Sequence, residues 1–386
     1  MSDIPTIALV GVGGFGRQHL INIERLASQG RVRLAALVTG SGVAPLRGQV
    51  DPAVTTMAEA VPVYPTLDDY LAAGDPATVV VISTPIHTHT DLATKALRAG
   101  AHVLLEKPPT PGMADFTFLE EVVAQTGRIV QVGFQSFGSH ALPRLAGLLA
   151  SGALGELSGV GAVGTWSRAA SYFTRSGWAG KREIDGIPVV DGVVTNPLAH
   201  AVATALEVAG ATRSGDVAEV VLDQYRANPI DCDDTSAVLV RTAAGIRVSL
   251  GLALTAPRQS PPRVIAYGTR GTATLHYVSD ALEVRIGGRT TTEQFGRTNL
   301  TENLLDHLAD PSIGLLCPLA ATGAFTTVLE AVHTAPDPRP VAADQVSWTR
   351  RDGDTWAVVE RVEEYCERVA AEGRTFADLG APWVTR

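Results

Sequence analysis

Apolar runs alternate with amphipathic segments over the first 135 residues. Helical spacing of apolar positions follows the first run, at Leu20, Ile23 and Leu26, and recurs near 91–99 and 115–124. Short apolar runs of this kind, separated by helices, are typical of strands buried on both faces of a parallel sheet. We therefore predict a doubly wound α/β domain, with strands at Thr6–Val10, Val32–Val38, Thr78–Ile82, Val103–Leu105 and Ile129–Gln135.

The pattern changes beyond residue 150, where short strands follow one another with turns between them. They are expected at 157–163, 217–225, 237–242, 247–252, 263–267, 272–277 and 282–286. This meander-like spacing predicts a large, mostly antiparallel open sheet in an α+β domain. We expect domains at 1–136 and 137–386, and an amphipathic helix over 354–371 that packs back on the body of the protein.

A glycine turn joins the first strand to the first helix. It contains Gly11, Gly13, Gly14, Phe15 and Gly16 in the sequence GVGGFG. In this context the glycines allow a tight turn, close approach of a pyrophosphate and close helix–strand packing, and the helix N-terminus favours phosphate. Dinucleotide binding is the favoured interpretation, and a glycine-rich surface turn is the alternative.

The second strand ends without the acidic residue that would hold the ribose hydroxyls of NAD. Thr39, Gly40 and Ser41 stand there, and Arg47 follows shortly. The absence of a carboxylate leaves room for a 2′-phosphate, so NAD(P) is expected with a modest preference for NADP. The alternative is that these are ordinary turn residues and a solvated arginine.

The strand at 103–105 ends in Glu106, Lys107 and Pro108, and proline cannot continue the ladder. Ligands bind at the carboxyl ends of parallel strands, where a lysine can polarise a substrate oxygen or donate a proton. A solvated Glu-Lys pair is the alternative.

The preceding strand leads into a loop with Thr84, Pro85, His87 and His89, which is expected to close over the nicotinamide side of the cofactor. Because no third ligand lies nearby, we expect no metal here.

Composition excludes some classes of protein. The 386 residues are 45% hydrophobic and 18% charged, with net charge −9, which argues against binding to nucleic acid or an anionic membrane. Three scattered cysteines predict no disulfide framework. No apolar run approaches membrane-spanning length, and the first strand begins too early to leave room for a signal peptide. A cytoplasmic protein is expected.

The motifs GVGGFG, STPIHTH, LLEKPPT and VGFQ together resemble the Gfo/Idh/MocA family, which includes glucose–fructose oxidoreductase and inositol dehydrogenase. The resemblance implies that Lys107 contacts the reacting oxygen, that Glu106 and Pro108 fix its position, and that Gln135 lies near the cofactor and substrate. Many members have arginine after that glutamine, whereas this chain has Ser136. The resemblance also implies a homo-oligomer, a dimer or tetramer, formed through the C-terminal sheet.

Aromatic and basic residues alternate in the second half. Trp166, Arg168, Tyr172, Arg175 and Trp178 suit a sugar ring with an acidic or phosphorylated substituent. The alternative, which the sequence does not separate from it, is a core-packing loop with a charged rim.

A helix is expected to begin near Asn196 and to continue past His200, with the two residues on one face. A histidine can take a hydroxyl proton near neutral pH. The family pattern has an acidic residue, three intervening residues and a histidine, which places His200 in the catalytic role and Asn196 where an aspartate is usual. Asparagine is not a base but can orient a substrate hydroxyl.

These observations predict an NAD(P)-dependent oxidoreductase that moves hydride between a secondary alcohol of a sugar, inositol or related polyol and the nicotinamide. Lys107 stabilises the oxyanion, His200 serves as acid or base and Asn196 positions the ring. Two alternatives stay open. One is redox-assisted glycoside cleavage or elimination with tightly bound NAD, and the other is a catalytically silent dinucleotide sensor.

Overall fold

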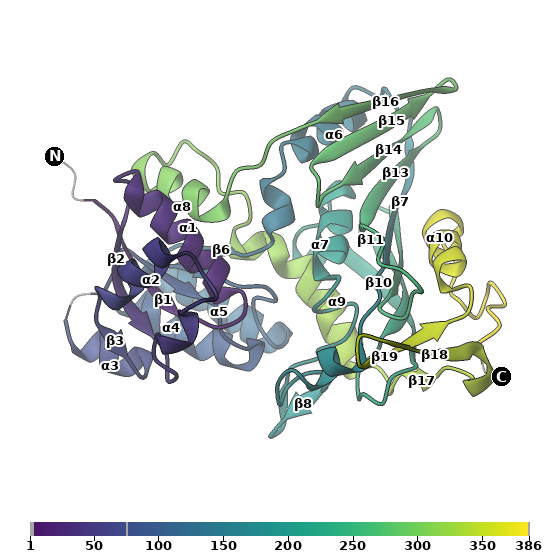
Figure 1. Ribbon diagram of the computed structural model, residues 1–386. Coiled ribbons are helices and arrows are strands. Elements are labelled where there is room, and N and C mark those ends of the chain that lie inside the picture. The colour runs from purple at the N-terminus through teal and green to yellow at the C-terminus, as the bar shows by residue number, and fades with distance from the viewer. Residues whose placement is uncertain (1–3, 75, 385–386) are drawn as a thin grey trace. The chain divides into compact units, whose positions relative to one another are not determined.

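A computed structural model describes residues 4–74 and 76–384. The described chain forms two compact units (Figure 1). The first contains the residues up to Gly133 together with Leu300–Leu319, and the second contains Phe134–Asn299 and the residues from Ala320 onward. A single boundary after residue 136 was expected from the sequence. In the structure, residues 300–319 also belong to the first unit.

A six-stranded parallel sheet forms the centre of the first unit, in the order β3-β2-β1-β4-β5-β6. All four residues of β4 are buried, as expected for a strand covered on both faces. This order, with helices between the strands, confirms the doubly wound prediction. The strands are β1 (Thr6–Val10), β2 (Arg33–Val38), β3 (Val63–Tyr64), β4 (Val79–Ile82), β5 (His102–Leu105) and β6 (Val130–Val132).

The helices of the first unit connect these strands, and one of them comes from the late return segment. They are α1 (Gly16–Ser28), η1 (Ala44–Leu46), α2 (Pro52–Glu59), α3 (Leu67–Ala72), η2 (Ile86–Thr88), α4 (His89–Arg98), α5 (Met113–Thr126) and α8 (Leu300–Ala309). The buried Gln131 of β6 fastens the return segment. Its amide nitrogen donates to the carbonyl oxygen of Leu300 (2.7 Å), and its amide oxygen accepts from the backbone N–H of Cys317 (3.1 Å).

A nine-stranded sheet forms the centre of the second unit, in the order β16-β15-β14-β13-β7-β12-β11-β10-β17. Neighbouring strands are antiparallel except for the pairs β7–β12 and β10–β17, so the prediction of a mostly antiparallel sheet is confirmed. The strands are β7 (Leu157–Thr165), β10 (Val217–Arg226), β11 (Thr235–Thr242), β12 (Arg247–Ala253), β13 (Arg263–Gly268), β14 (Gly271–His276), β15 (Ala281–Ile286), β16 (Arg289–Gln294) and β17 (Arg339–Pro340).

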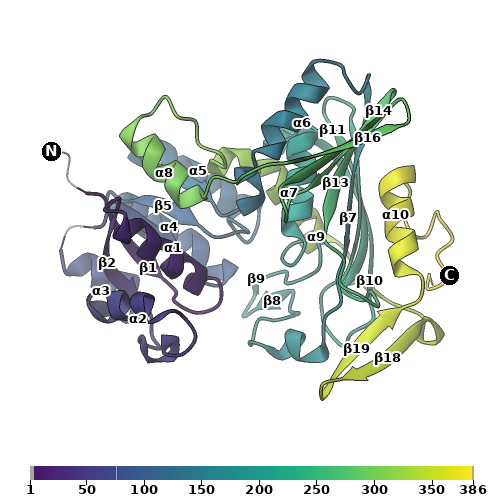
Figure 2. The same ribbon diagram turned by 45° about the horizontal axis from the view of Figure 1, so that its top comes forward.

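Helices cover both faces of this large sheet. Figures 1 and 2 show α7 (Ala199–Val208) and α10 (Val362–Glu372) on opposite sides. Glycines on central strands allow the close approach: a Cβ at Gly251 would collide with the backbone of Cys366 in α10, and one at Gly164 would meet Leu198. The other helices are η3 (Gln135–Gly138), α6 (Ala141–Ala150), η4 (Ala170–Thr174), η5 (Ser214–Asp216), η6 (Leu319–Thr322), α9 (Gly323–Thr334) and η7 (Ala343–Gln345).

The expectation of one helix over 354–371 is wrong for its first third. Residues Asp354–Val359 form strand β19, which pairs with β18 (Val346–Arg351), and the helix begins at Val362. The turn between the strands has both Asp352 (φ 49°) and Gly353 (φ 81°) in the left-handed region. Asp-Gly at this position is a hairpin signal that the helical interpretation overlooked. A second short ribbon consists of β8 (Glu183–Ile184) and β9 (Ile187–Pro188).

Two expected element boundaries also differ. Strand β6 ends at Val132, and Gln135 opens the short helix η3 instead of ending a strand. Helix α7 begins at Ala199, so Asn196 lies in the turn before the helix and not on the helical face of His200. The reason is Pro197, which disfavours helical backbone at the residue before it. Among the described residues, no helix is long and apolar enough to cross a membrane.

Candidate active site

The glycine turn between β1 and α1 has the geometry of a phosphate cradle. Gly11 has φ 86°, and a Cβ there would collide with the carbonyl of Ser83; a Cβ at Gly16 would collide with the carbonyl of Gly11. The Cβ directions of Gly13 and Gly14 meet nothing within 4 Å. The first turn of α1 holds no acidic residue that would compete for its N–H groups. The turn therefore fits a diphosphate. Phe15 caps α1 and is 49% exposed.

The residues after β2 form a small polar turn. The hydroxyl groups of Thr39 and Ser41 lie 3.1 Å apart, and the backbone N–H of Ser41 also donates to the Thr39 hydroxyl (3.3 Å). Gly40 lies between them. Arg47, expected to attract a 2′-phosphate, forms an ion pair with Glu59 (2.8 Å). Its guanidinium therefore already has a carboxylate partner.

The loop after β4 divides its two histidines between different environments. Both ring nitrogens of the buried His89 lie 2.8 Å from carbonyl oxygens, those of Pro108 and Thr84. Burial lowers the pKa of His89. The two carbonyl oxygens act in the opposite direction, because each favours a proton on the nitrogen that faces it. His89 thus connects Thr84 to Pro108 and stabilises the loop. His87 instead has a buried Nδ1 that finds no hydrogen-bond partner among the described residues. Pro85 precedes η2, and the Thr84 hydroxyl bonds that of Thr88 (2.7 Å).

The Glu-Lys-Pro segment follows β5 directly, as the sequence predicts. Glu106 is buried, and its Oε1 lies 2.8 Å from Nε2 of the buried His19 on α1. Its other oxygen accepts from the backbone N–H of Lys107 (3.2 Å), and the Lys107–Pro108 peptide is cis. The Glu106 carboxylate also packs so closely on Gly133 that a Cβ there would meet it at 2.7 Å. Glu106 therefore joins the helix after the glycine turn to the backbone that carries Lys107.

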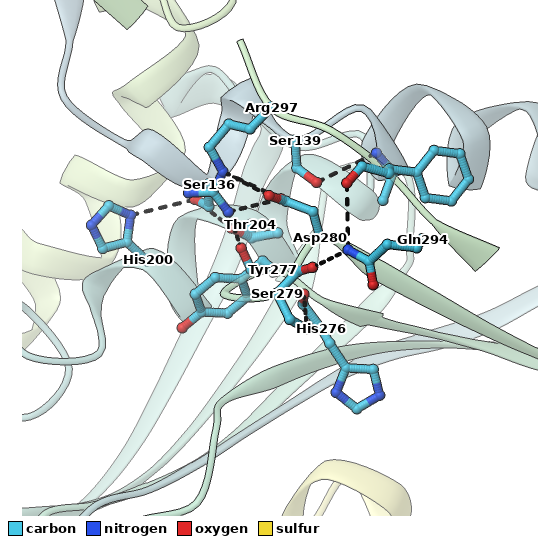
Figure 3. A network of polar contacts seen from close by, with 12 residues as sticks. Ser136, Ser139, His200, Thr204, His276, Tyr277, Ser279, Asp280, Gln294 and Arg297 are labelled. Carbon is cyan, nitrogen blue, oxygen red and sulfur yellow. Dashed lines mark hydrogen bonds and ion pairs between the residues drawn. The ribbon is translucent and has the colours of Figure 1, made fainter. Parts of the chain in front are cut away.

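His200 stands in the first turn of α7, in the second unit. Its Nδ1 lies 3.4 Å from the hydroxyl of Ser136, which accepts a hydrogen bond from Thr204 (2.9 Å; Figure 3). The edge of the ring also packs on the buried Phe134, with centroids 5.6 Å apart. The imidazole is therefore oriented from two sides.

The loop that carries Ser136 is itself supported from the segment after β16. Arg297 binds the Asp280 carboxylate (2.8 Å) and the carbonyl of Tyr277 (Figure 3). The next residue, Thr298, donates its N–H to Gly138 (2.9 Å). Gln135 is half-buried at the start of the same loop.

Asn196 is held by a carboxylate that sequence analysis did not single out. Its amide nitrogen donates to Asp191, whose side chain is only 2% exposed. Asp191 also accepts from Arg175 (2.9 and 3.2 Å) and from the N–H of Gly180 (2.8 Å). The residue before it, Val190, has φ 43°, an unusual conformation for a β-branched residue and one that marks strain.

The aromatic and basic residues of 166–178 form a stack. The guanidinium of Arg168 lies over Trp166 (4.5 Å) and Tyr172 (5.3 Å). That of Arg175 lies over Tyr172 (3.9 Å) and Trp178 (4.5 Å). The five residues thus come together, and desolvation by burial raises the pKa of Tyr172. No group of three potential metal ligands occurs within residues 4–74 and 76–384.

Comparison with known proteins identifies the architecture. Residues 6–134 match the family model described as "Oxidoreductase family, NAD-binding Rossmann fold", and residues 143–274 match the "GFO/IDH/MocA C-terminal domain". The chain belongs to the Gfo/Idh/MocA family. The resemblance inferred from the motifs is therefore confirmed, and the first unit is an NAD-binding Rossmann domain.

Among curated Gfo/Idh/MocA relatives, inositol 2-dehydrogenase 1 of Saccharopolyspora erythraea is 26% identical over 213 residues, 54% of this chain and 57% of that protein. The chain therefore spans little more than half of that relative. A solved WlbA dehydrogenase from Bordetella pertussis, in complex with NADH and UDP-GlcNAcA, is 21% identical at TM-score 0.68 and covers 86% of this chain and 96% of its own. A 3-ketoreductase from Actinomadura kijaniata, in complex with TDP-benzene and NADP, is 15% identical at TM-score 0.68 and covers 88% and 100%. At such identities these structures show the shared fold.

Two residues of this Gfo/Idh/MocA chain were missed from the sequence, His19 and Asp191. His19 follows the last glycine of the fingerprint by three residues, so it lies one helical turn into α1. Asp191 is a single acid within the apolar run Val189–Val194, and such an acid must find partners when it is buried. The sequence could have singled out both residues, but it could not predict that His19 contacts Glu106 or that Asp191 contacts Arg175.

Proposed function

We propose that this protein is an NAD(P)-dependent oxidoreductase that acts on a secondary alcohol of a sugar, inositol or related polyol. The observation that carries the proposal is the hydrogen-bonded pair His19–Glu106, which ties the cofactor cradle to the backbone of Lys107 within one unit. The names of the relatives, an inositol dehydrogenase and an enzyme in complex with UDP-GlcNAcA, support this substrate class.

In this proposal the nicotinamide, when bound, exchanges hydride with the substrate carbon. The Lys107 ammonium stabilises negative charge on the substrate oxygen. His200 takes the hydroxyl proton during oxidation and returns it during reduction, with its ring oriented by Ser136 and Phe134. The amide of Asn196, fixed by Asp191, orients a neighbouring hydroxyl. Lys107 belongs to the first unit and His200 to the second.

For the cofactor, we propose that the site accepts NADP as well as NAD. The end of β2 presents hydroxyl groups at Thr39 and Ser41, and these do not repel a 2′-phosphate as an aspartate would. Arg47 supports binding of the 2′-phosphate of NADP less than its sequence position suggested, because its guanidinium is paired with Glu59. The relatives include structures with NADH and with NADP. A cytoplasmic homo-oligomer assembled through the nine-stranded sheet remains part of the proposal.

A panel of inositols, sugars and sugar nucleotides, each with NAD and NADP, tests the proposal by nicotinamide absorbance. Lys107→Met should lower kcat by at least about 100-fold, the usual scale for losing one group that stabilises an oxyanion, with cofactor affinity nearly unchanged. The matched control is Lys95→Met, since Lys95 on α4 pairs with Asp91 of the same helix and with Asp68 of α3. Retained turnover in Lys107→Met would remove the lysine from the mechanism. Glycoside cleavage without net cofactor reduction would instead favour redox-assisted elimination.

A further inference from the structure

Two arginines lie on the Tyr172 ring but differ in how their charge is compensated. Arg175 binds both carboxylate oxygens of the buried Asp191. Arg168 bonds neutral acceptors, among them the side-chain oxygen of Gln259 (2.6 Å), the carbonyl of Ser167 (3.3 Å) and the hydroxyl of Tyr172. Within the part of the chain that the structure describes, no carboxylate forms an ion pair with Arg168. The cluster therefore carries one guanidinium in excess of its carboxylates.

This excess charge sits in an unfavourable place. Arg168 is half-buried, and desolvation by burial lowers its pKa, although the neighbouring Tyr172 acts in the opposite direction. The positive charge of Arg175 lowers it further. A partly desolvated cation beside a second cation is stabilised by an anion that binds between or beside them.

The backbone holds Arg168 firmly. Its N–H donates to the carbonyl of Leu254 (3.0 Å), and the N–H of Trp166 donates to Ala253 at the end of β12 (2.8 Å). The guanidinium is also fixed between the rings of Trp166 and Tyr172. A cation held in this way binds an anion without first losing side-chain freedom.

Side-chain contacts connect this cation to the proposed acid–base residue. Arg175 shares Tyr172 with Arg168, and Asp191 joins Arg175 to Asn196. The backbone carbonyl of Asn196 accepts a hydrogen bond from the N–H of Ala199 (3.3 Å), the first residue of α7. His200 is the next residue of that helix. All of these residues belong to the second unit. An anion at Arg168 would therefore be bound on the surface of the unit that also carries His200.

We propose that Arg168 binds an oxyanion of the substrate, a carboxylate or phosphate group carried by the sugar, whereas Arg175 has a structural role. The planar guanidinium suits both groups because it can donate two parallel hydrogen bonds. The inference rests on the proposed function for the sugar, but anion binding can be measured without turnover. It makes Arg168 a specificity-determining residue that separates anionic sugars from neutral polyols.

The test is calorimetric titration of the full chain, saturated with NAD, with D-glucose, D-glucuronate, D-glucose 6-phosphate, UDP-glucose and UDP-glucuronate. We expect at least one anionic probe to bind roughly 10- to 100-fold more tightly than glucose, the scale of hydrogen bonds to charged groups. Comparison of D-glucuronate with D-glucose 6-phosphate shows whether Arg168 binds a carboxylate or a phosphate group. Arg168→Gln should abolish the preference, and Arg168→Lys should restore part of it. The control, Arg241→Gln, changes an exposed arginine on β11 that pairs with Glu219 and should leave all affinities unchanged.

Equal affinities for anionic and neutral sugars would overturn the inference. A fall by the same factor for both classes in Arg168→Gln would also overturn it, because that is what a merely structural role predicts. A different result would contradict the proposed hydride transfer. If no probe reduces NAD or NADP, but the preference for anions persists and depends on Arg168, the oxyanion site stands and the dehydrogenase proposal does not.

Discussion

Ser136 occupies the position where many Gfo/Idh/MocA members have arginine, and in this protein its hydroxyl faces the candidate base. A hydroxyl can donate to Nδ1 of a neutral imidazole or accept from it, so Ser136 can orient His200 through a cycle of proton transfer. The donated hydrogen bond from Thr204 fixes the hydroxyl in turn. Ser136 is therefore a positioning residue.

Ser136→Ala should lower kcat by about 3- to 30-fold, the scale of one lost hydrogen bond, and should shift the pH profile of kcat/KM because Nδ1 loses its partner. Cofactor affinity should not change. Ser139→Ala, which alters a buried serine of the same loop without a contact to His200, serves as the control. An unchanged pH profile together with a lower melting temperature would show that Ser136 only supports the loop.

Asp234 is the residue whose protonation should be visible in stability. It is buried, and burial raises its pKa to about 6, although the N–H groups of Asn228 and Ala227 favour the charged form. The folded protein therefore holds this proton up to about pH 6, whereas the unfolded chain releases it near the ordinary aspartate pKa of 3.8. Between these values the folded state binds more proton, so this group's contribution to stability falls as pH rises.

Relative to Asp234→Asn, the free energy of unfolding of the wild type should fall by about 2 kcal/mol as pH rises from about 4 to about 6, with a slope of at most about 1.4 kcal/mol for each pH unit. Urea denaturation at several pH values measures this difference. The exposed neighbour Asp231, which pairs with Lys181, provides the control Asp231→Asn, for which no such trend is expected. A difference that stays constant across this range would mean that Asp234 remains ionised.

At the scale of elements, the sequence was most informative where a local pattern also determined the tertiary arrangement. The run before Glu106 predicted β5 and its carboxyl-terminal motif because a strand buried on both faces must be apolar and proline ends it. Residues 354–359 misled because their amphipathic spacing continued into α10, and only the Asp-Gly turn marks the hairpin β18–β19.

The candidate site was predictable by residue type more than by partner. Lys107 and His200 could be named in advance because the motifs around them resemble those of the family, and the members of the 166–178 stack because aromatic and basic residues alternate there. The partners His19 and Asp191 could not, since each contact joins residues whose proximity depends on the completed fold. The same limit applies to Asn196, whose turn is held by a carboxylate five residues away.

At the scale of the whole molecule, the return of 300–319 to the first unit is the feature that no local pattern signals. Gln131 fixes it with hydrogen bonds to Leu300, Asn303 and Cys317, all within the first unit. The Rossmann unit is thus completed by a segment that the chain supplies only after strand β16 of the nine-stranded sheet.

Gln131→Leu keeps the size of the side chain but removes the hydrogen bonds to the carbonyl of Leu300, the side-chain oxygen of Asn303 and the N–H of Cys317. We expect the free energy of unfolding to fall by about 2–4 kcal/mol and amide hydrogen exchange in 300–319 to accelerate. Gln29→Leu, at an exposed position after α1, should change stability by less than about 0.5 kcal/mol. Unaltered exchange in the return segment would show that other contacts hold it.

The carboxylate shared by His19 and the backbone of Lys107 has a practical consequence for anyone who redesigns this protein. Substitutions that alter the fingerprint helix around His19 should also disturb the backbone of Lys107, because one buried acid contacts both. Coenzyme binding and reactivity are then not independent targets, and a variant library should vary position 19 and position 106 together.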